Sequence, residues 1–191
     1  MVLSPTSLLL VYSLGICKII SCLQFFTTTV LKWIPVLHND RYKQIIIDSL
    51  SFLTINNRCK VYGLVIMPNH IHLIWQINEN HKREDVQRDF LKYTSQQIRF
   101  GLQDTNSDLL PQFEVNLKDR KYQIWQRNPL SIDLLSRKTI EQKLDYIHAN
   151  PVKGKWMLAD DFVQYHYSSA AFYEEDNSEF KFLKHYMELF E

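Results

Sequence analysis

Two strand-like runs joined by a very short connection constrain the fold of this chain more than any other feature. The runs cover residues 60–66 and 71–77, and both are rich in β-branched and aromatic side chains. Pro68 and Asn69 stand at the centre of the connection, and this pair is typical of a tight turn. The pattern predicts a β-hairpin, and therefore an antiparallel sheet built around it.

The segments before and after the hairpin predict the rest of that sheet and its helices. Residues 24–30 read as a strand, and Asp40 stands where an N-cap would precede a helix that ends near Asn56 and Asn57. Apolar residues recur at helical spacing across residues 82–102, which predicts a second long helix. The polar residues 104–119 are expected to form a loop.

The last part of the chain adds one strand and further helices. Residues 122–127 alternate like a short strand, and a third helix is expected to end before Pro151. A final helix is expected near residues 180–190. The order β-α-β-β-α-β-α predicts an α+β fold with a ferredoxin-like (RRM-like) core. Its antiparallel sheet would carry helices on one face and leave the other open to a ligand.

Length and charge limit the possible classes of protein. A chain of 191 residues with 46% hydrophobic and 23% charged residues has the composition of one globular domain. The net charge of +1 gives no reason to expect a nucleic-acid partner, but its distribution does. Residues 117–155 hold nine basic and four acidic side chains, whereas residues 156–191 hold two basic and eight acidic ones. A polyanion would prefer the basic stretch.

Cysteine usage and the N-terminal segment bear on the compartment. The three cysteines include no C-x-x-C pair, which favours a reducing compartment over a disulfide framework. Residues 7–16 are apolar enough for a signal peptide, but no basic residue precedes them and no small-x-small site follows. They are also too short to span a bilayer. We therefore expect a cytoplasmic protein with no membrane contact, whose residues 1–23 form an N-terminal extension of uncertain role.

Two small groups of residues could carry chemistry. His70 and His72 flank Ile71 at a strand start, so both imidazoles point to one face and could share a metal ion, or could simply be surface histidines. Tyr146 and Asn150 are four residues apart on the third helix and share a face, although helix packing for Tyr146 and a C-cap at Asn150 are the simpler explanation of this pair alone. Tyr93 and Gln97 have the same spacing on the second helix.

These residues lie in two segments that resemble the REP-associated tyrosine transposases, relatives of the single-tyrosine HUH transposases. The segments are YGLVIMPNHIHLIW at residues 62–75 and LDYIHANPVKG at residues 144–154. The resemblance runs over residues 24–173, and it includes Tyr167-Ser-Ser169. It implies a catalytic domain over residues 24–156. The acidic, aromatic residues 157–191 would then form a tail packed on the same domain.

The resemblance also implies a role for each residue. His70 and His72 would ligate Mg²⁺ or Mn²⁺, Tyr146 would be the nucleophile, and Asn150 would be the third ligand, at a position where related enzymes often have Gln. Two imidazoles and one amide oxygen leave coordination positions for phosphate oxygens and water. Tyr146 would form a covalent 5′-phosphotyrosine with single-stranded DNA, on hairpin-forming repeats, as a monomer or a homodimer. The alternatives are a catalytically silent nucleic-acid-binding module of the same fold and a metallohydrolase that uses water.

Other side chains have less specific signals. The residues most suited to contact DNA phosphates are basic, although a solvated charged loop would look the same: Lys118, Arg120, Lys121 and Arg127. Trp75 and Trp125 could stack on bases, but core positions are the simpler expectation. His148 follows Tyr146 by two residues, about 200° around the helix, so it should point away from the nucleophile.

Overall fold

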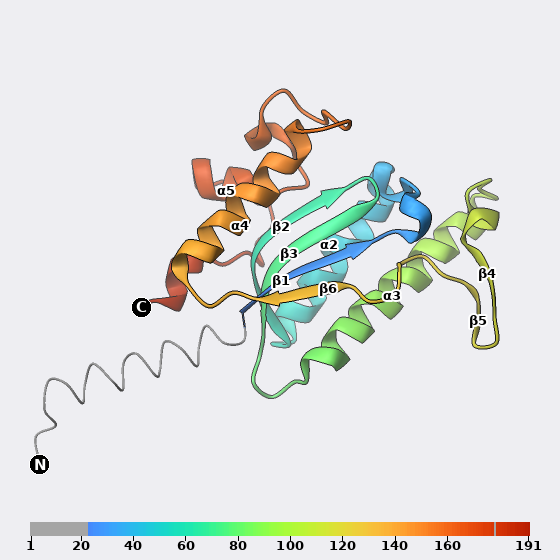
Figure 1. The fold of residues 1–191 in the computed structure, drawn as a ribbon, viewed down its shortest axis with the longest axis horizontal. Helices are drawn as coiled ribbons and strands as arrows, with labels where there is room; N and C mark the ends of the chain where they lie inside the picture. The colour runs from blue at the N-terminus through green and yellow to red at the C-terminus, as the bar shows by residue number, and fades with distance from the viewer. Residues whose placement is uncertain (1–22, 178) are drawn as a thin grey trace, which may run out of the picture.

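The computed structural model describes residues 23–177 and 179–191, and it has the expected α+β core (Figure 1). The sheet has the order β2-β3-β1-β6, and every neighbouring pair is antiparallel. Its elements are β1 (Leu23–Thr29), α2 (Asp40–Ile55), β2 (Cys59–Met67), β3 (His70–Ile77), α3 (Arg83–Asp104), β6 (Leu130–Asp133) and α4 (Arg137–Ala149). The ferredoxin-like prediction is confirmed. Residues 1–22 lie outside the described residues, so the N-terminal extension stays a prediction.

Shorter elements connect and follow this core. They are β4 (Glu114–Leu117), β5 (Arg120–Tyr122), α5 (Ala170–Glu175) and the 3-10 helices η1 (Leu31–Trp33), η2 (Val36–His38), η3 (Leu110–Phe113), η4 (Asn150–Val152), η5 (Phe162–Gln164) and η6 (Tyr186–Leu189). Helix α2 begins where expected, but Asn39 and not Asp40 is its N-cap, because the Asn39 side chain accepts a hydrogen bond from the Arg41 N–H at 3.0 Å. Among the described residues, none of the helices could cross a membrane.

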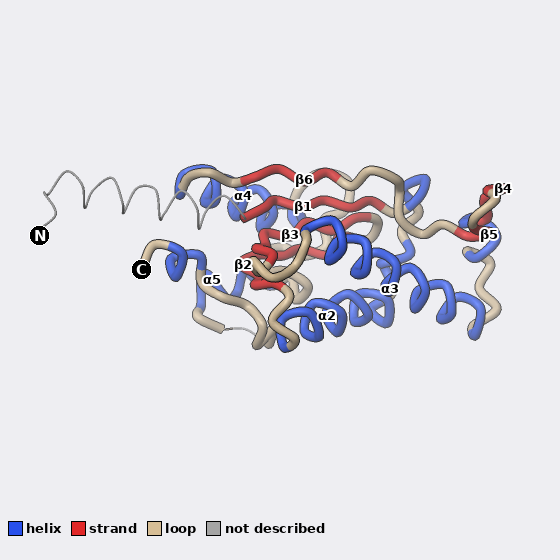
Figure 2. The backbone as a smooth tube through the Cα atoms, turned by 90° about the horizontal axis from the view of Figure 1, so that it is seen from below, coloured by secondary structure: helices blue, strands red, loops and turns tan. Residues whose placement is uncertain are grey.

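Helices cover both faces of the sheet, which corrects the expectation of one open face. Helices α2 and α3 lie side by side on one face (Figure 2), over buried residues such as Phe26 and Trp75. Helix α4 packs on the opposite face, where Leu144 and Ile147 bury against Ile74. An amphipathic helix must bury its apolar stripe, and this one does so over β2 and β3. Only the β1 and β6 side of that face remains open.

Gly63 allows α4 to approach the sheet closely. A Cβ atom at this position would lie 2.8 Å from Cδ2 of Leu144 and 3.1 Å from Cδ1 of Ile147. The strand pairing shifts register between Val61 and Gly63, as at a β-bulge. A side chain at residue 63 would therefore displace the Leu144 and Ile147 side chains, through which α4 packs on the strands.

Two expectations for the middle of the chain are wrong. The polar loop expected over residues 104–119 contains η3 and β4, and β4 pairs with β5 in a separate hairpin. The strand expected over residues 122–127 is not the last sheet strand; β6 is, after Asn128 and Pro129. Trp125 is buried and donates a hydrogen bond from Nε1 to Oγ1 of Thr94 at 2.9 Å, so this segment packs on α3. Trp75 and Trp125 both lie in the core, as expected.

The C-terminal residues cover one edge of the sheet without the long helix expected over residues 180–190. Only η6 forms there. Leu183 pairs with Val61 of β2, and the N–H of Lys184 donates to the Val61 carbonyl at 2.9 Å. The Tyr186 hydroxyl donates to Glu141 of α4 at 2.7 Å. Phe180 and Leu183 thus reach the core from turns and an isolated bridge, and Tyr186 and Leu189 reach it from η6, without a long helix.

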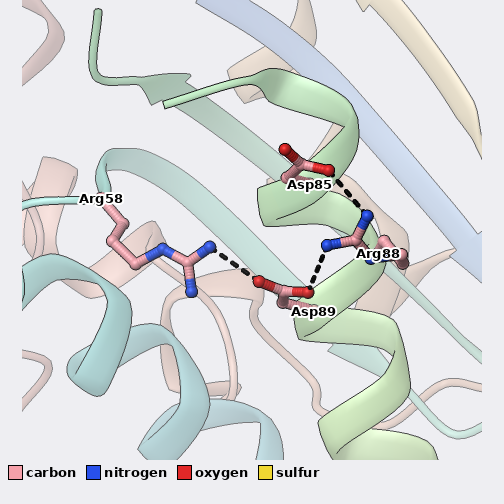
Figure 3. Close-up of polar contacts among 4 residues, drawn as sticks. All are labelled: Arg58, Asp85, Arg88 and Asp89. Atoms are coloured by element: carbon pink, nitrogen blue, oxygen red, sulfur yellow. Dashed lines mark hydrogen bonds and ion pairs between the residues drawn. The ribbon is translucent and has the colours of Figure 1, made fainter. Parts of the chain in front are cut away.

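A chain of ion pairs joins α3 to the start of β2 (Figure 3). Arg58 contacts Asp89 at 2.8 Å, Asp89 contacts Arg88 at 3.0 Å, and Arg88 contacts Asp85 at 2.7 Å. Arg58 is the most buried of these side chains, so its pair is the least screened by solvent. The network holds α3 on the face of the sheet opposite to α4.

Candidate active site

His70 and His72 lie on the α4 face of the sheet, at the start of β3. The strand register places His72 opposite Thr27 and His70 opposite Thr29 on β1. The two imidazole rings are 4.8 Å apart between centroids, while Ile71 is fully buried on the other face. The alternation expected from the sequence is therefore present, and both rings share one site.

Each imidazole is oriented through Nδ1. Nδ1 of His72 lies 2.7 Å from the Thr27 hydroxyl, and Nδ1 of His70 lies 2.7 Å from Oδ1 of Asn69. Nε2 of His72 is buried and has no hydrogen-bond partner in the described chain. Desolvation lowers the pKa of His70 to about 4. Desolvation, together with the charges of His70 and Lys143, lowers the pKa of His72 to about 3. Both imidazoles are neutral at pH 7, the state that can ligate a metal.

Tyr146 projects from α4 toward these histidines. Ser136 caps the helix, its side chain accepting from the Thr139 N–H while the Thr139 side chain bonds back to the Ser136 backbone. The Tyr146 ring lies 5.3 Å from the His72 ring and 6.0 Å from the Phe25 ring, between centroids. Its side chain is 49% exposed, so the phenol is open to a macromolecular substrate.

Asn150 follows one turn later and also borders the site. Its Nδ2 donates a hydrogen bond to the Tyr146 carbonyl at 3.1 Å, so it is both the C-cap of α4 and a site residue. That bond uses the amide nitrogen and leaves Oδ1 as the atom for a cation. The two roles that the sequence left as alternatives are compatible in this geometry.

These residues line one open depression, here called the histidine pocket, of about 550 Å³. Its lining combines the sheet face, the turn after β1 and helix α4: Phe25, Thr27, Thr29, Trp33, His70, His72, Leu130, Lys143, Tyr146 and Asn150. Among the described residues, no group of three or more His, Cys, Asp or Glu side chains is placed to hold a metal ion. A divalent cation here would therefore depend on two imidazoles, the Asn150 amide and substrate oxygens. The unpartnered Nε2 of His72 fits such an ion, because a ligand bond would satisfy it.

Lys143 is a pocket residue that the sequence did not single out. Its Nζ lies 4.5 Å from the centroid of the Phe25 ring and 5.5 Å from that of Tyr146. It precedes Tyr146 by three residues, so it shares a helix face with the phenol. That spacing was the available signal, but a lysine on a helix is usually solvated. Here the ammonium lies inside the histidine pocket, between the Phe25 and Tyr146 rings.

Trp33 is the second residue that the sequence did not reveal. Its ring lies 6.2 Å from the His70 ring, and its side chain is 57% exposed at the rim of the histidine pocket. Lys32 and Trp33 have φ values of 54° and 60°, in the left-handed region that non-glycine residues seldom adopt. The usual sequence signal for left-handed backbone is Gly or Asn, and neither residue occurs at these two positions.

Tyr93 lies far from the histidines in the fold. It is 47% exposed, almost as much as Tyr146, but it belongs to a cavity of about 430 Å³ lined by residues of α2 and α3 together with Arg58. That cavity is on the helical face opposite to α4. The fold brings the Tyr146–Asn150 pair to His72, whereas Tyr93 lines a different cavity from His70 and His72.

Comparison with known proteins now adds to this geometry. The solved structure of a REP-associated tyrosine transposase bound to a REP hairpin aligns with this chain at a TM-score of 0.56 and 20% sequence identity. The alignment covers 78% of this chain and 76% of the other. The chain shares the fold of that transposase.

Other comparisons add less. A candidate transposase from Deinococcus radiodurans aligns at a TM-score of 0.45 and 18% identity, over 65% of this chain and 87% of that one, and we draw nothing from it. No family model and no curated protein sequence matches the chain.

The four predicted phosphate contacts lie outside the histidine pocket. Arg120 and Lys121 belong to β5, and they pair with Asp119 at 2.7 Å and Glu114 at 3.4 Å. Arg120 and Arg127 instead line an open depression of about 680 Å³ beside α3, and Lys118 lies next to it in the β4–β5 turn. A role of these residues in binding DNA stays a prediction.

His148 points away from the histidine pocket, as its position on α4 predicted. The side chain is buried, and Nε2 lies 2.8 Å from the Ser169 hydroxyl. Desolvation lowers its pKa to about 4. His148 therefore joins α4 to the Tyr167-Ser-Ser169 segment in the neutral state.

Proposed function

We propose that this chain is a single-strand DNA endonuclease and strand transferase of the REP-associated tyrosine transposase type. The observation that carries the proposal is the half-exposed Tyr146 phenol, whose ring lies 5.3 Å from that of His72. Nε2 of His72 has no hydrogen-bond partner among the described residues. Nothing in packing requires an open phenol beside a pair of neutral imidazoles. A tyrosine nucleophile next to a metal site accounts for both features.

The chemistry assigned to Tyr146 exchanges one phosphodiester for another. The phenolic oxygen forms a bond to phosphorus and gives up its proton, and the bond from phosphorus to the bridging 3′ oxygen breaks. The departing 3′ oxygen takes a proton to become a free hydroxyl, while the 5′ phosphate stays on Tyr146. Attack by a second 3′-hydroxyl reverses the step and joins a new strand, so no ATP is needed.

The remaining pocket residues bind and orient the substrate in this proposal. His70 and His72 through Nε2, and Asn150 through Oδ1, would hold Mg²⁺ or Mn²⁺, which when bound polarises the phosphate oxygens. Lys143 places a positive charge beside the phenol and offsets the charge of the incoming phosphate. The bond from Asn150 to the Tyr146 carbonyl keeps nucleophile and ligand in fixed relation.

The substrate class follows from the openness of the site and from the fold. A depression open to solvent suits an extended polynucleotide better than a small molecule. The solved transposase with this fold is bound to a REP hairpin, which supports hairpin-forming DNA as the substrate here. We assign the reaction to the cytoplasm, because three cysteines without a C-x-x-C pair suit a reducing compartment.

Labelled oligonucleotides test the proposal and separate it from its alternatives. Hairpin-containing single strands labelled at either end are incubated with Mn²⁺ or EDTA and run on a denaturing gel. We expect the 3′-labelled fragment to migrate with the protein and the 5′-labelled fragment to be released with a 3′-hydroxyl that a polymerase can extend. Cleavage without an adduct would indicate hydrolysis by water. Binding without cleavage would indicate a silent nucleic-acid-binding module.

A further inference from the structure

We propose that Trp33 stacks on a nucleobase of the single strand, at the nucleotide next to the phosphate that Tyr146 attacks. This inference rests on the proposed function and adds to it a binding position for one base. An exposed tryptophan alone would not support it, because isolated exposed apolar residues are common on proteins. The support comes from the backbone that holds Trp33 and from its connection to His70.

The backbone at Trp33 adopts a conformation that costs free energy. Two successive residues, Lys32 at φ 54° and Trp33 at φ 60°, lie in the left-handed region, and neither is Gly or Asn. A bulky side chain is a clear outlier there, and glycine would be free of the penalty. Strained residues of this kind cluster at ligand sites, where the surrounding structure holds them in place.

Several hydrogen bonds hold this turn against the strain. The Leu31 N–H donates to the Ile124 carbonyl at 2.7 Å, and the Trp33 N–H donates to the Val30 carbonyl at 2.9 Å. The Val30 N–H donates to the Asn69 carbonyl at 2.8 Å. The indole is therefore presented to solvent by a turn that neighbouring segments hold at several points.

The Asn69 side chain links Trp33 directly to the candidate metal ligand. Its Nδ2 donates to the Trp33 carbonyl at 3.4 Å, and its Oδ1 lies 2.7 Å from Nδ1 of His70. One amide thus positions both the exposed indole and the imidazole. A group bound at His70 would lie next to the indole, and this fixed relation is unnecessary if Trp33 is only a surface residue.

The chemistry of this corner fits a nucleobase. The indole is a flat apolar surface that lines the same pocket as His70 and Tyr146, and the half-exposed Leu130 of β6 adds a second apolar side chain to that lining. Bases of single-stranded nucleic acid stack on aromatic side chains largely independently of sequence. A nucleotide joins both features, because its phosphate can occupy the site while its base covers the ring.

Abasic substitution tests this assignment in the full chain. Tyr146→Phe is used as background so that binding is measured without cleavage, and the probe is the labelled oligonucleotide cleaved in the assay above. Abasic sites are scanned across the cleavage position in proteins with Trp33 and with Trp33→Gly. We expect Trp33→Gly to weaken binding about 5-fold to 150-fold, the equivalent of one lost base stack. In the protein that keeps Trp33, an abasic site at one position should weaken binding by the same factor. The same abasic site should not weaken binding further in the Trp33→Gly protein.

Thermal unfolding distinguishes a binding role from a structural one. Gly is unstrained at φ 60°, so Trp33→Gly should leave the Tm unchanged or raise it, and Trp33→Phe should keep most of the affinity. Phe52→Ala, at an exposed aromatic on α2, should leave binding unchanged. The assignment of Trp33 would be overturned if Trp33→Gly bound the oligonucleotide as tightly as before, or if its loss added to the loss at every abasic position. Cleavage by the unaltered chain would still support the proposed function in that case. Absence of any cleavage by the unaltered chain would overturn both.

Discussion

The Thr27 hydroxyl lies 2.7 Å from Nδ1 of His72, across the β1–β3 pair. When Nε2 ligates a cation, the ring proton must lie on Nδ1, so Thr27 then accepts this hydrogen bond. Such a partner fixes the tautomer and the orientation of the ring. Thr27 touches no substrate in our proposal, so its effect should appear in metal affinity first.

Thr27→Val tests this relationship, since valine keeps the shape and β-propensity of threonine but has no hydroxyl. We expect Mn²⁺ affinity to fall roughly 10-fold to 100-fold, as for other residues that orient metal ligands. Thr29→Val is the matched control, because Thr29 lines the same pocket on the same strand and pairs with His70 in register. Calorimetric titration of both variants measures the difference, and equal affinities would argue against an orienting role for Thr27.

Tyr146→Phe should abolish the covalent protein–DNA adduct and leave DNA binding nearly unchanged, because only the phenolic oxygen is removed. Tyr93→Phe is a close control: Tyr93 is also half exposed on a helix and precedes Gln97 by four residues. It should form the adduct at the normal rate. Loss of the adduct in Tyr93→Phe and its persistence in Tyr146→Phe would reverse the assignment of the nucleophile.

Asn150→Asp should bind Mn²⁺ at least as tightly as the unaltered chain, because a carboxylate oxygen of similar reach replaces the amide oxygen. It should nevertheless cleave more slowly, since the added charge opposes the approach of DNA. Asn150→Ala should lose metal affinity and activity.

A purely structural Asn150 gives a different result. Removing the cap bond to the Tyr146 carbonyl would then cost about 1 kcal/mol or less of stability and leave Mn²⁺ binding unchanged. Titration of Mn²⁺ into all three proteins decides between the two roles, and three equal affinities would exclude Asn150 from the site.

Lys143→Gln should slow cleavage and make DNA binding less sensitive to salt, because one phosphate contact is lost. The slope of log affinity against log salt should fall by about 0.7 for a single strand. Lys138→Gln, on the same helix but outside the histidine pocket, should leave the slope unchanged. An equal change in both variants would indicate a general effect of net charge.

The stability of the metal-free protein should fall with pH below the ordinary histidine range. Burial lowers the pKa of His148 from 6.5 to about 4, so between these values the unfolded chain binds a proton that the native chain does not. This stabilisation is complete above pH 6.5 and declines as the pH falls toward 4. The free energy of unfolding is measured with urea, in EDTA, at pH 7 and at pH 5. The fall between the two pH values should be smaller in His148→Gln than in the unaltered chain. An identical loss would contradict the low pKa.

Local patterns in the sequence were sufficient for the hairpin of β2 and β3 and for α4. Pro68 and Asn69 fix the turn, strand alternation sets the face of both histidines, and Pro151 ends the helix one turn after Tyr146. The tail was harder, because residues 180–190 have helix-like spacing but Leu183 pairs with Val61 at the edge of β2, and only the short η6 follows. Tertiary pairing overrides local preference in such a segment.

The errors at the site have a common cause, since they depend on contacts between distant segments. Strand β6 has four residues with half-exposed Leu130 and Ile132, so only pairing with β1 defines it. The left-handed turn at Lys32 and Trp33 contains no Gly or Asn from which it could be predicted. Lys143 differs from a solvated lysine only because α4 packs on this face of the sheet.

The packing that brings Tyr146 to the histidines depends on a residue that belongs to neither group, Gly63. Tyr146 is carried by a helix and His72 by a sheet, and the two layers approach where Gly63 offers no side chain to Leu144. The distance from the Tyr146 phenol to the histidines thus depends on how closely α4 packs on the sheet. A methyl group at residue 63 would have to displace the Leu144 and Ile147 side chains, and where these cannot yield, α4 itself would move away from the histidines while every side chain of the pocket stayed the same. The size of one strand residue behind α4 is therefore a means of changing the geometry of the site without altering its lining.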